Sequence, residues 1–151
     1  MLTSMRSVLS ETVMPFFRRP PVLQLAALCH RQTARGREIL LITSSHGRWI
    51  LPKGWPIDGK TSGETAMKEA WEEAGIKEGD VANDPVGSFM THKRYDDGRA
   101  IPCETAVYAI EVKKVANKFP EAEKRERKWV SVEEATDLVD DTGLQRLLQK
   151  F

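Results

Sequence analysis

The apolar positions in the first third of the chain fall into short runs that turns separate. Residues 22–30 and 37–43 each form a mostly apolar run, and a brief third run at 49–51 ends at Pro52, a residue that cannot donate a hydrogen bond to a sheet. Runs of this length between turn residues are typical of buried strands, although the alanines and leucines of residues 22–30 would also suit a helix. The pattern therefore predicts β-sheet before the first helix.

The periodicity changes to that of a helix after Thr61. Thr61 is a favourable N-cap, Glu64 three residues later completes a capping box, and Gly75 is the expected C-terminal stop. We therefore predict a helix that runs to about Ala74, with one apolar face and one acidic face. The apolar face consists of Ala66, Met67, Ala70, Trp71 and Ala74.

The second half of the chain continues with strands and closes with helices. Strands are expected over residues 86–91, 100–112 and 129–130, and helices over residues 131–139 and 143–151. This order predicts one α+β domain over residues 21–151, in which helices flank a mixed sheet. Residues 1–20 are assigned to an N-terminal arm that either packs on the domain or on a partner, or frays.

The composition is that of an ordinary globular domain, with 40% hydrophobic and 30% charged residues in a chain of 151. The net charge of +1 argues against a nucleic-acid partner, because general phosphate binding needs a marked cationic excess. No run approaches the ~18 apolar residues that span a membrane, so no membrane partner is expected. Only Cys29 and Cys103 are present, so neither a disulfide framework nor a four-cysteine zinc site is implied. These features predict a cytoplasmic monomer or homodimer with reduced thiols.

Three glutamates of the predicted helix carry the candidate chemistry. Glu69, Glu72 and Glu73 are spaced i, i+3 and i+4, so a helix projects them from one side. Carboxylates at this spacing repel one another unless a cation lies among them, and oxygen ligands suit a hard divalent cation. The spacing therefore predicts a site for Mg²⁺, with Mn²⁺ as the alternative.

The segment from Leu51 to Ile76 (LPKGWPIDGKTSGETAMKEAWEEAGI) resembles the signature of the Nudix hydrolase family. That signature is glycine, five residues, glutamate, seven residues, and then arginine-glutamate-aliphatic-any-glutamate-glutamate-any-glycine-aliphatic. The spacing is kept throughout, and the matching positions are Gly54, Glu69, Glu72, Glu73, Gly75 and Ile76. Lys60 and Lys68 stand where the first glutamate and the arginine belong. A match of this length is far more specific than a lone glycine pattern.

The resemblance implies an αβα sandwich around a mixed sheet. It also implies hydrolysis of a nucleoside diphosphate linked to another group, or of another pyrophosphate compound, by attack of water on phosphorus. Glu69 and Glu73 are then the expected direct metal ligands, and the carbonyl of Gly54 is a further one. Glu72 is expected to be a ligand or the base that activates water. A base from the downstream loop is the alternative, where the candidates are Glu121, Glu123 and Glu126.

Residues 51–54, 124–129 and 132–135 resemble the diadenosine tetraphosphate and diphosphoinositol polyphosphate hydrolase branches of the family. We therefore favour a dinucleoside polyphosphate or a diphosphoinositol polyphosphate as the substrate. An RNA 5′-pyrophosphohydrolase and a non-catalytic ligand-binding module are the alternatives. The candidates for contacts with substrate phosphates are Lys53, Arg48, His92, Lys93 and Arg94, and for each the alternative is a solvated surface charge.

In the family, the exchanged glutamate and arginine brace the loop on the helix, a pair that two lysines cannot form. Glu64 lies four residues from both Lys60 and Lys68, and we predict that it bridges them. The carboxylate site would then survive with a different brace. The charged run from Glu121 to Lys128 is interpreted as a solvated turn.

Overall fold

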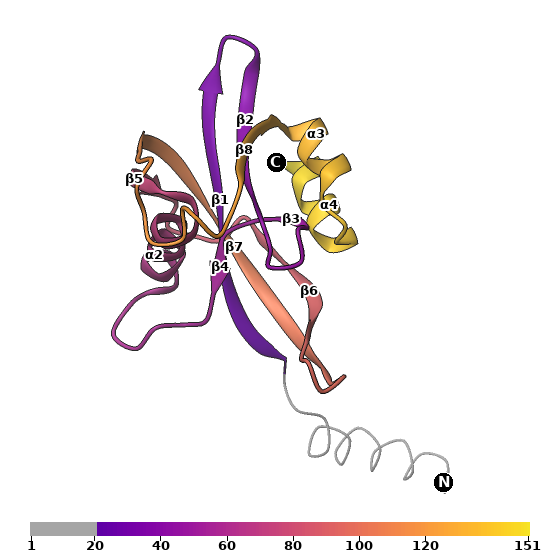
Figure 1. The fold of residues 1–151 in the computed structure, drawn as a ribbon. Coiled ribbons are helices and arrows are strands. Elements are labelled where there is room, and N and C mark those ends of the chain that lie inside the picture. Colours follow the sequence, from indigo (N-terminus) through magenta and orange to yellow (C-terminus); the bar gives the residue numbers. More distant parts are fainter. Residues whose placement is uncertain (1–20) are drawn as a thin grey trace, which may run out of the picture.

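The computed structural model describes residues 21–151, so the predicted arm at residues 1–20 lies outside the described residues. The strands are β1 (Val22–Thr33), β2 (Gly36–Thr43), β3 (Trp49–Ile50), β4 (Lys53–Gly54), β5 (Ile76–Val81), β6 (Gly87–Arg94), β7 (Ala100–Val115) and β8 (Arg127–Ser131). The helices are α2 (Ser62–Ala74), α3 (Val132–Leu138) and α4 (Thr142–Lys150) (Figure 1). The prediction of a strand over residues 22–30, rather than a helix, is confirmed.

The strands form one mixed sheet in the order β3-β2-β1-β7-β5. β1 and β7 run parallel at its centre, from Val22 opposite Cys103 to His30 opposite Glu111, whereas the other pairs are antiparallel. The shorter strands attach to these central ones: β4 pairs with β1, β6 with β7 and β8 with β2. A parallel pair needs a long crossover between its strands, and α2 lies within this one.

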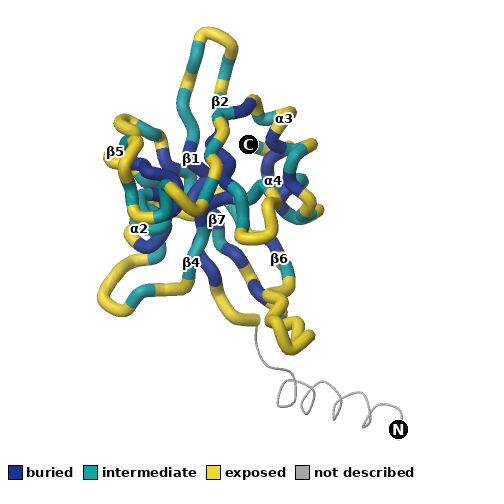
Figure 2. Tube along the Cα trace, in the orientation of Figure 1, coloured by how far each residue is buried: buried dark blue, intermediate teal, exposed yellow. Residues whose placement is uncertain are grey.

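Helices cover both faces of the sheet, with α2 on one side and α3 and α4 on the other (Figure 1). Because successive side chains of a strand point to opposite faces, Ala26 and Leu28 pack towards α3 and α4, whereas Ala27 and Cys29 pack towards α2. The buried residues gather in the middle of the sheet, and the hairpin tips are exposed (Figure 2). This is the expected αβα sandwich, and it explains why β1 is apolar without alternation.

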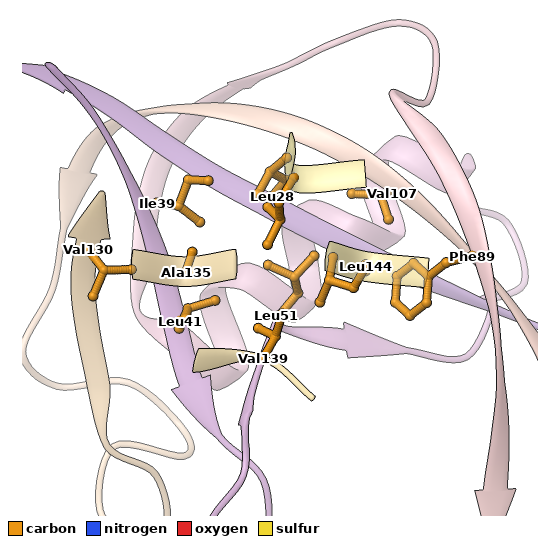
Figure 3. Packing of buried hydrophobic residues seen from close by; sticks show 12 residues of the cluster. Leu28, Ile39, Leu41, Leu51, Phe89, Val107, Val130, Ala135, Val139 and Leu144 are labelled. Atoms are coloured by element: carbon orange, nitrogen blue, oxygen red, sulfur yellow. The ribbon is translucent and has the colours of Figure 1, made fainter. Parts of the chain in front are cut away.

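The core between the sheet and the two C-terminal helices contains large aliphatic side chains. Leu28 of β1, Ile39 of β2 and Leu144 of α4 are almost inaccessible to solvent and pack in one cluster (Figure 3). The core on the other face is thinner at the helix, because α2 contributes small residues there: Ala66, Ala70 and Ala74. This close approach brings the backbone of α2 near β1 and β4, and with it the acidic side chains.

Strand β5 has no counterpart among the predicted elements. Three of its six residues, IKEGDV, are charged and exposed, and the sequence lacks the alternation that marks a strand. The strand forms because it pairs with the C-terminal half of β7, with register shifts on either side of Glu78. Within residues 21–151, no helix is both long enough and apolar enough to cross a bilayer.

Candidate metal and phosphate site

Helix α2 begins and ends where the sequence predicts. The Thr61 side chain accepts a hydrogen bond from the backbone N–H of Glu64, and the Glu64 carboxylate accepts one from the N–H of Thr61, so the capping box is complete. At the other end, Gly75 has a φ of 73° and its N–H donates to the last turn. Since this left-handed conformation favours glycine, Gly75 fixes the helix end. The register of the glutamates is therefore set by both caps.

Glu69 and Glu73 lie beside strand β4, which carries Gly54. A β-carbon added to Gly54 would lie 2.4 Å from Cδ of Glu69, so only glycine permits this approach. Glu73 is 5% exposed, and its carboxyl group is hydrogen-bonded to that of Glu69. Burial, together with this hydrogen bond, raises the pKa of Glu73 to about 8. Burial likewise raises the pKa of Glu69.

Two carboxylates this close together repel each other. A divalent cation compensates the same pair of charges, and oxygen ligands of this kind suit Mg²⁺ or Mn²⁺. The carbonyl of Gly54, on β4 beside Glu69, is a third oxygen that could bind such a cation. The donor set therefore fits the metal that the sequence predicts.

Glu72 takes a different direction. Its carboxylate forms an ion pair with Lys68 on the same helix. Across residues 21–151, no three acidic, histidine or cysteine side chains gather in a metal-binding arrangement. The structure thus brings two of the predicted ligands together and leaves the third beside them, and the role of Glu72 stays a prediction.

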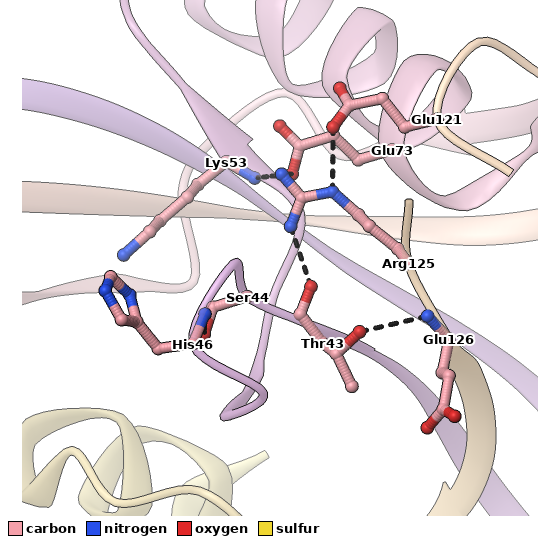
Figure 4. Close-up of polar contacts among 8 residues, drawn as sticks. All are labelled: Thr43, Ser44, His46, Lys53, Glu73, Glu121, Arg125 and Glu126. Atoms are coloured by element: carbon pink, nitrogen blue, oxygen red, sulfur yellow. Dashed lines mark hydrogen bonds and ion pairs between the residues drawn. The ribbon is translucent and has the colours of Figure 1, made fainter. Parts of the chain in front are cut away.

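The interpretation of residues 121–128 as a solvated turn holds only in part: residues 121–124 form a turn and Glu123, Lys124, Glu126 and Lys128 are exposed, but Arg125 is not. The Arg125 side chain is 19% exposed, and each of its nitrogens faces a different partner (Figure 4). Nε donates to Oε1 of Glu121 at 2.9 Å, Nη1 donates to the carbonyl of Thr43 at 2.8 Å, and Nη2 lies 3.5 Å from Oε1 of Glu73. Sequence reasoning missed this residue because charge runs are usually solvated, although it falls in the segment 124–129 that carries the family resemblance.

Among the three downstream glutamates, Glu121 lies nearest the pair. Its backbone N–H donates to the carbonyl of Glu72 at 2.9 Å, and its charge contributes to the raised pKa of Glu69. Glu123 and Glu126 are exposed. The carboxylate of Glu126 points away from Glu73 (Figure 4).

The predicted bridge from Glu64 to the two lysines does not form. The Glu64 carboxylate is used in the capping box, whereas Lys68 pairs with Glu72. Lys60 and Lys68 instead line a cavity of about 740 Å³ together with Trp71. The periodicity of α2 places this cavity on the side of the helix that faces away from Glu69 and Glu73.

Lys53 connects the carboxylates to a group of cations. Its backbone N–H donates to Oε1 of Glu73 at 3.3 Å, while its side chain extends in another direction, towards His46 (Figure 4). Burial lowers the pKa of the Lys53 ammonium, and the charges of Lys93 and Arg48 lower it further, partly opposed by Asp141. The side chain borders a small cavity of about 40 Å³, which Arg48 and Asp141 also line.

Two of the five predicted phosphate-binding residues, Lys53 and Arg48, line the same small cavity, and the charge of Lys93 helps to lower the pKa of the Lys53 ammonium. Strand alternation separates the other two from them, because His92 and Arg94 point to the face of β6 opposite to Lys93. Both side chains are exposed.

The fold and this site define a class of protein: an αβα sandwich in which helix α2 holds one buried and one half-buried carboxylate beside several cations. The family model of the NUDIX domain matches residues 22–151. The chain belongs to this family.

Curated relatives agree with this assignment. The chain is 33% identical over 120 residues to Nudix hydrolase 13, mitochondrial, of Arabidopsis thaliana, a match that covers 76% of this chain and 59% of the relative. It is 31% identical over 114 residues to diphosphoinositol polyphosphate phosphohydrolase 3-beta of Bos taurus, covering 73% of this chain and 64% of that protein. The chain thus spans about three fifths of the length of such relatives.

Solved structures share the fold. A crystal structure of C. elegans Ap4A hydrolase superposes with a TM-score of 0.66 at 20% identity, covering 87% of this chain and 96% of that one. The E. coli dihydroneopterin triphosphate pyrophosphohydrolase has a TM-score of 0.66 at 15% identity, covering 89% and 95%. At these identities the likeness shows the fold alone.

Proposed function

We propose that this protein is a metal-dependent pyrophosphohydrolase that cleaves a phosphoanhydride bond in a polyphosphorylated small molecule. One observation carries the proposal: Lys53 joins the carboxylate pair of Glu69 and Glu73 to a group of cations. Its backbone N–H holds Glu73, and its ammonium lies near Arg48 and Lys93. A metal-binding pair next to a phosphate-binding cluster is the arrangement that this hydrolysis needs.

The oxygens of Glu69, Glu73 and Gly54 are the proposed ligands of Mg²⁺, with Mn²⁺ as a substitute. When bound, the cation neutralises charge on the phosphate oxygens and makes water a stronger nucleophile. Glu72 is a further ligand or base once it leaves Lys68. The buried position of Glu73 restricts access of bulk water to the pair, which strengthens its interaction with a cation.

The remaining steps use side chains of this chain. Lys53, Arg48 and Lys93 bind the phosphate oxygens and orient the anhydride for in-line attack. The oxygen of a water molecule forms a bond to phosphorus as the bridging P–O bond breaks, and the leaving phosphate departs with the electron pair of that bond. The proton of the water passes to a carboxylate, for which Glu72 and Glu121 are the two candidates.

Dinucleoside polyphosphates and diphosphoinositol polyphosphates are the first substrates to test. One relative is named as a diphosphoinositol polyphosphate phosphohydrolase and one structural neighbour as an Ap4A hydrolase. The favoured location remains the cytoplasm, on the ground that Cys29 and Cys103 are free and buried, although several relatives are named as mitochondrial.

The test is a panel of pyrophosphate compounds, including 5′-triphosphorylated RNA, incubated with Mg²⁺ or Mn²⁺ while phosphate release is followed. We expect turnover of a polyphosphorylated small molecule, and a loss of at least about 100-fold in Glu73→Gln. The exposed Glu133→Gln on α3 is the matched control. Absence of turnover with every compound, together with equal ligand binding by wild type and Glu73→Gln, would instead support a non-catalytic ligand-binding module.

A further inference from the structure

Arg125 is the one residue of the described chain whose side chain contacts both Glu73 of α2 and Glu121 of the loop before β8. We propose that Arg125 is a positioning residue: it fixes the orientation of the Glu73 carboxylate and holds Glu121 beside it. The inference rests on the proposed role of Glu73 as a metal ligand. It assigns to the loop at residues 116–126 a part in the site that the signature segment does not supply.

The orientation of the Glu73 carboxylate is restricted from two directions. Two donors converge on the same oxygen: the backbone N–H of Lys53 lies 3.3 Å from Oε1, and Nη2 of Arg125 lies 3.5 Å from it. A carboxylate held at one oxygen from two directions cannot rotate freely about its terminal bond. The Glu73 carboxylate is thereby restrained next to Glu69, the other proposed ligand.

Position 125 requires an arginine and not a lysine. The three nitrogens of Arg125 serve three partners, on the loop, on β2 and on α2. The rigid planar fork of a guanidinium can do this, whereas the single nitrogen of a lysine cannot reach all three at once. A half-buried cation with two carboxylates and a carbonyl around it is also well compensated for its loss of water.

The loop that carries Arg125 is anchored on two sides. Thr43 and Glu126 exchange two hydrogen bonds: the N–H of Thr43 donates to the Glu126 carbonyl at 3.0 Å, and the N–H of Glu126 donates to Oγ1 of Thr43 at 2.9 Å. On the other side, the N–H of Glu121 donates to the carbonyl of Glu72. Arg125 therefore extends from a backbone that is fixed to both β2 and α2, which makes it a rigid support.

Charge and positioning make opposite predictions. If Arg125 acted only through its charge, its removal would relieve repulsion and strengthen cation binding at Glu73. If it positions the carboxylates, its removal weakens cation binding, as loss of an outer partner of a metal ligand typically does, by about 10- to 100-fold. The affinity for Mn²⁺ therefore distinguishes an effect of the Arg125 charge from a positioning effect. A third possibility, that Arg125 only stabilises the loop, needs a control variant.

The control is Arg127→Gln. Arg127 also ties this loop to α2, since Nη1 donates to the carbonyl of Ala74 at 2.8 Å and Nη2 to Oδ1 of Asn117 at 2.9 Å. Neither of these partners is a carboxylate of the site, so the loss of Arg127 affects the attachment of the loop without freeing Glu73.

The experiment measures the dissociation constant of Mn²⁺ alone, by titration calorimetry or electron paramagnetic resonance, for the full chain freed of metal with EDTA. We expect Arg125→Gln to bind Mn²⁺ about 10- to 100-fold more weakly than wild type, Arg125→Lys to show a smaller loss, and Arg127→Gln to remain close to wild type. Unchanged or tighter binding in Arg125→Gln, or an equal loss in Arg127→Gln, would overturn the proposal. Circular dichroism checks the fold; if Arg125→Gln does not fold, Arg125→Lys against Arg127→Gln decides.

The same variants distinguish failure of this inference from failure of the proposed function. If Mn²⁺ binding by the wild type depends on Arg125 but no substrate is hydrolysed, the proposed enzymatic function fails and the positioning role stands. If the wild type hydrolyses a substrate and kcat is unchanged in Arg125→Gln, the proposed function stands and the positioning role of Arg125 fails. We expect kcat to fall and KM to change little, because Arg125 lies on the carboxylate side of Lys53 and away from its ammonium.

Discussion

The sharpest test of the carboxylate site is the substitution Gly54→Ala. A β-carbon at this position would lie 2.4 Å from Cδ, 2.5 Å from Oε1 and 2.9 Å from Cγ of Glu69. Ordinary contacts between such atoms lie near 3.5 Å, so the carboxylate must move by about 1 Å. A displacement of that size at a catalytic group lowers the rate by about 100-fold.

The fold should survive this change. The clashing atoms belong to the end of a flexible side chain, so the domain relaxes through a strained rotamer of Glu69 at a cost of about 0.5–1.5 kcal/mol. For a domain of this size, the melting temperature would fall by about 2–4 °C. We therefore expect a large loss of kcat and of Mn²⁺ affinity with a small loss of stability.

The assay combines kcat on the best substrate of the panel, Mn²⁺ titration and thermal unfolding. Gly87→Ala is the matched control, because its new β-carbon would meet only the mobile end of Leu147 at 3.3 Å and the residue lies on β6, away from the carboxylate pair. Wild-type kcat and Mn²⁺ affinity in a folded Gly54→Ala protein would show that the observed position of Glu69 has no functional role.

Three further outcomes are expected. Lys60→Glu should leave kcat largely unchanged, since Lys60 lines the cavity on the far side of α2; complete loss of activity in the folded variant would place Lys60 on the substrate. Lys53→Met should raise KM by about 10- to 100-fold, the value of a charge-assisted hydrogen bond to phosphate, and an unchanged KM in steady-state kinetics would exclude that contact. The raised pKa of Glu73 means that the metal-free fold binds a proton more tightly than the unfolded chain, so urea unfolding in EDTA should show stability falling as the pH rises from about 4.5 to about 8. Mg²⁺ should restore stability at the upper end of that range, and a flat profile with no effect of Mg²⁺ would contradict the raised pKa of the buried Glu73 carboxyl group.

The buried strands and the capped helix could be predicted because their signals are local. The capping box of Thr61 and Glu64 and the left-handed Gly75 depend on residues within one turn of each other, and the structure contains both as expected. The polar strand β5 could not be predicted in this way, since its reason for forming is the free edge of β7. Backbone pairing with a distant strand leaves no pattern in the strand's own residues.

The chain's local sequence thus determined the fold class, the family signature and the helix on which Glu69 and Glu73 lie. The tertiary structure decided how that helix is used. Ion pairs and close contacts between distant segments set the direction of each long side chain: Glu72 turns to Lys68, and Glu73 is held by Lys53 and by Arg125 of a loop far away in the sequence. Spacing along a helix fixes only the face from which a side chain leaves, because its end is placed by whatever the rest of the fold brings near it.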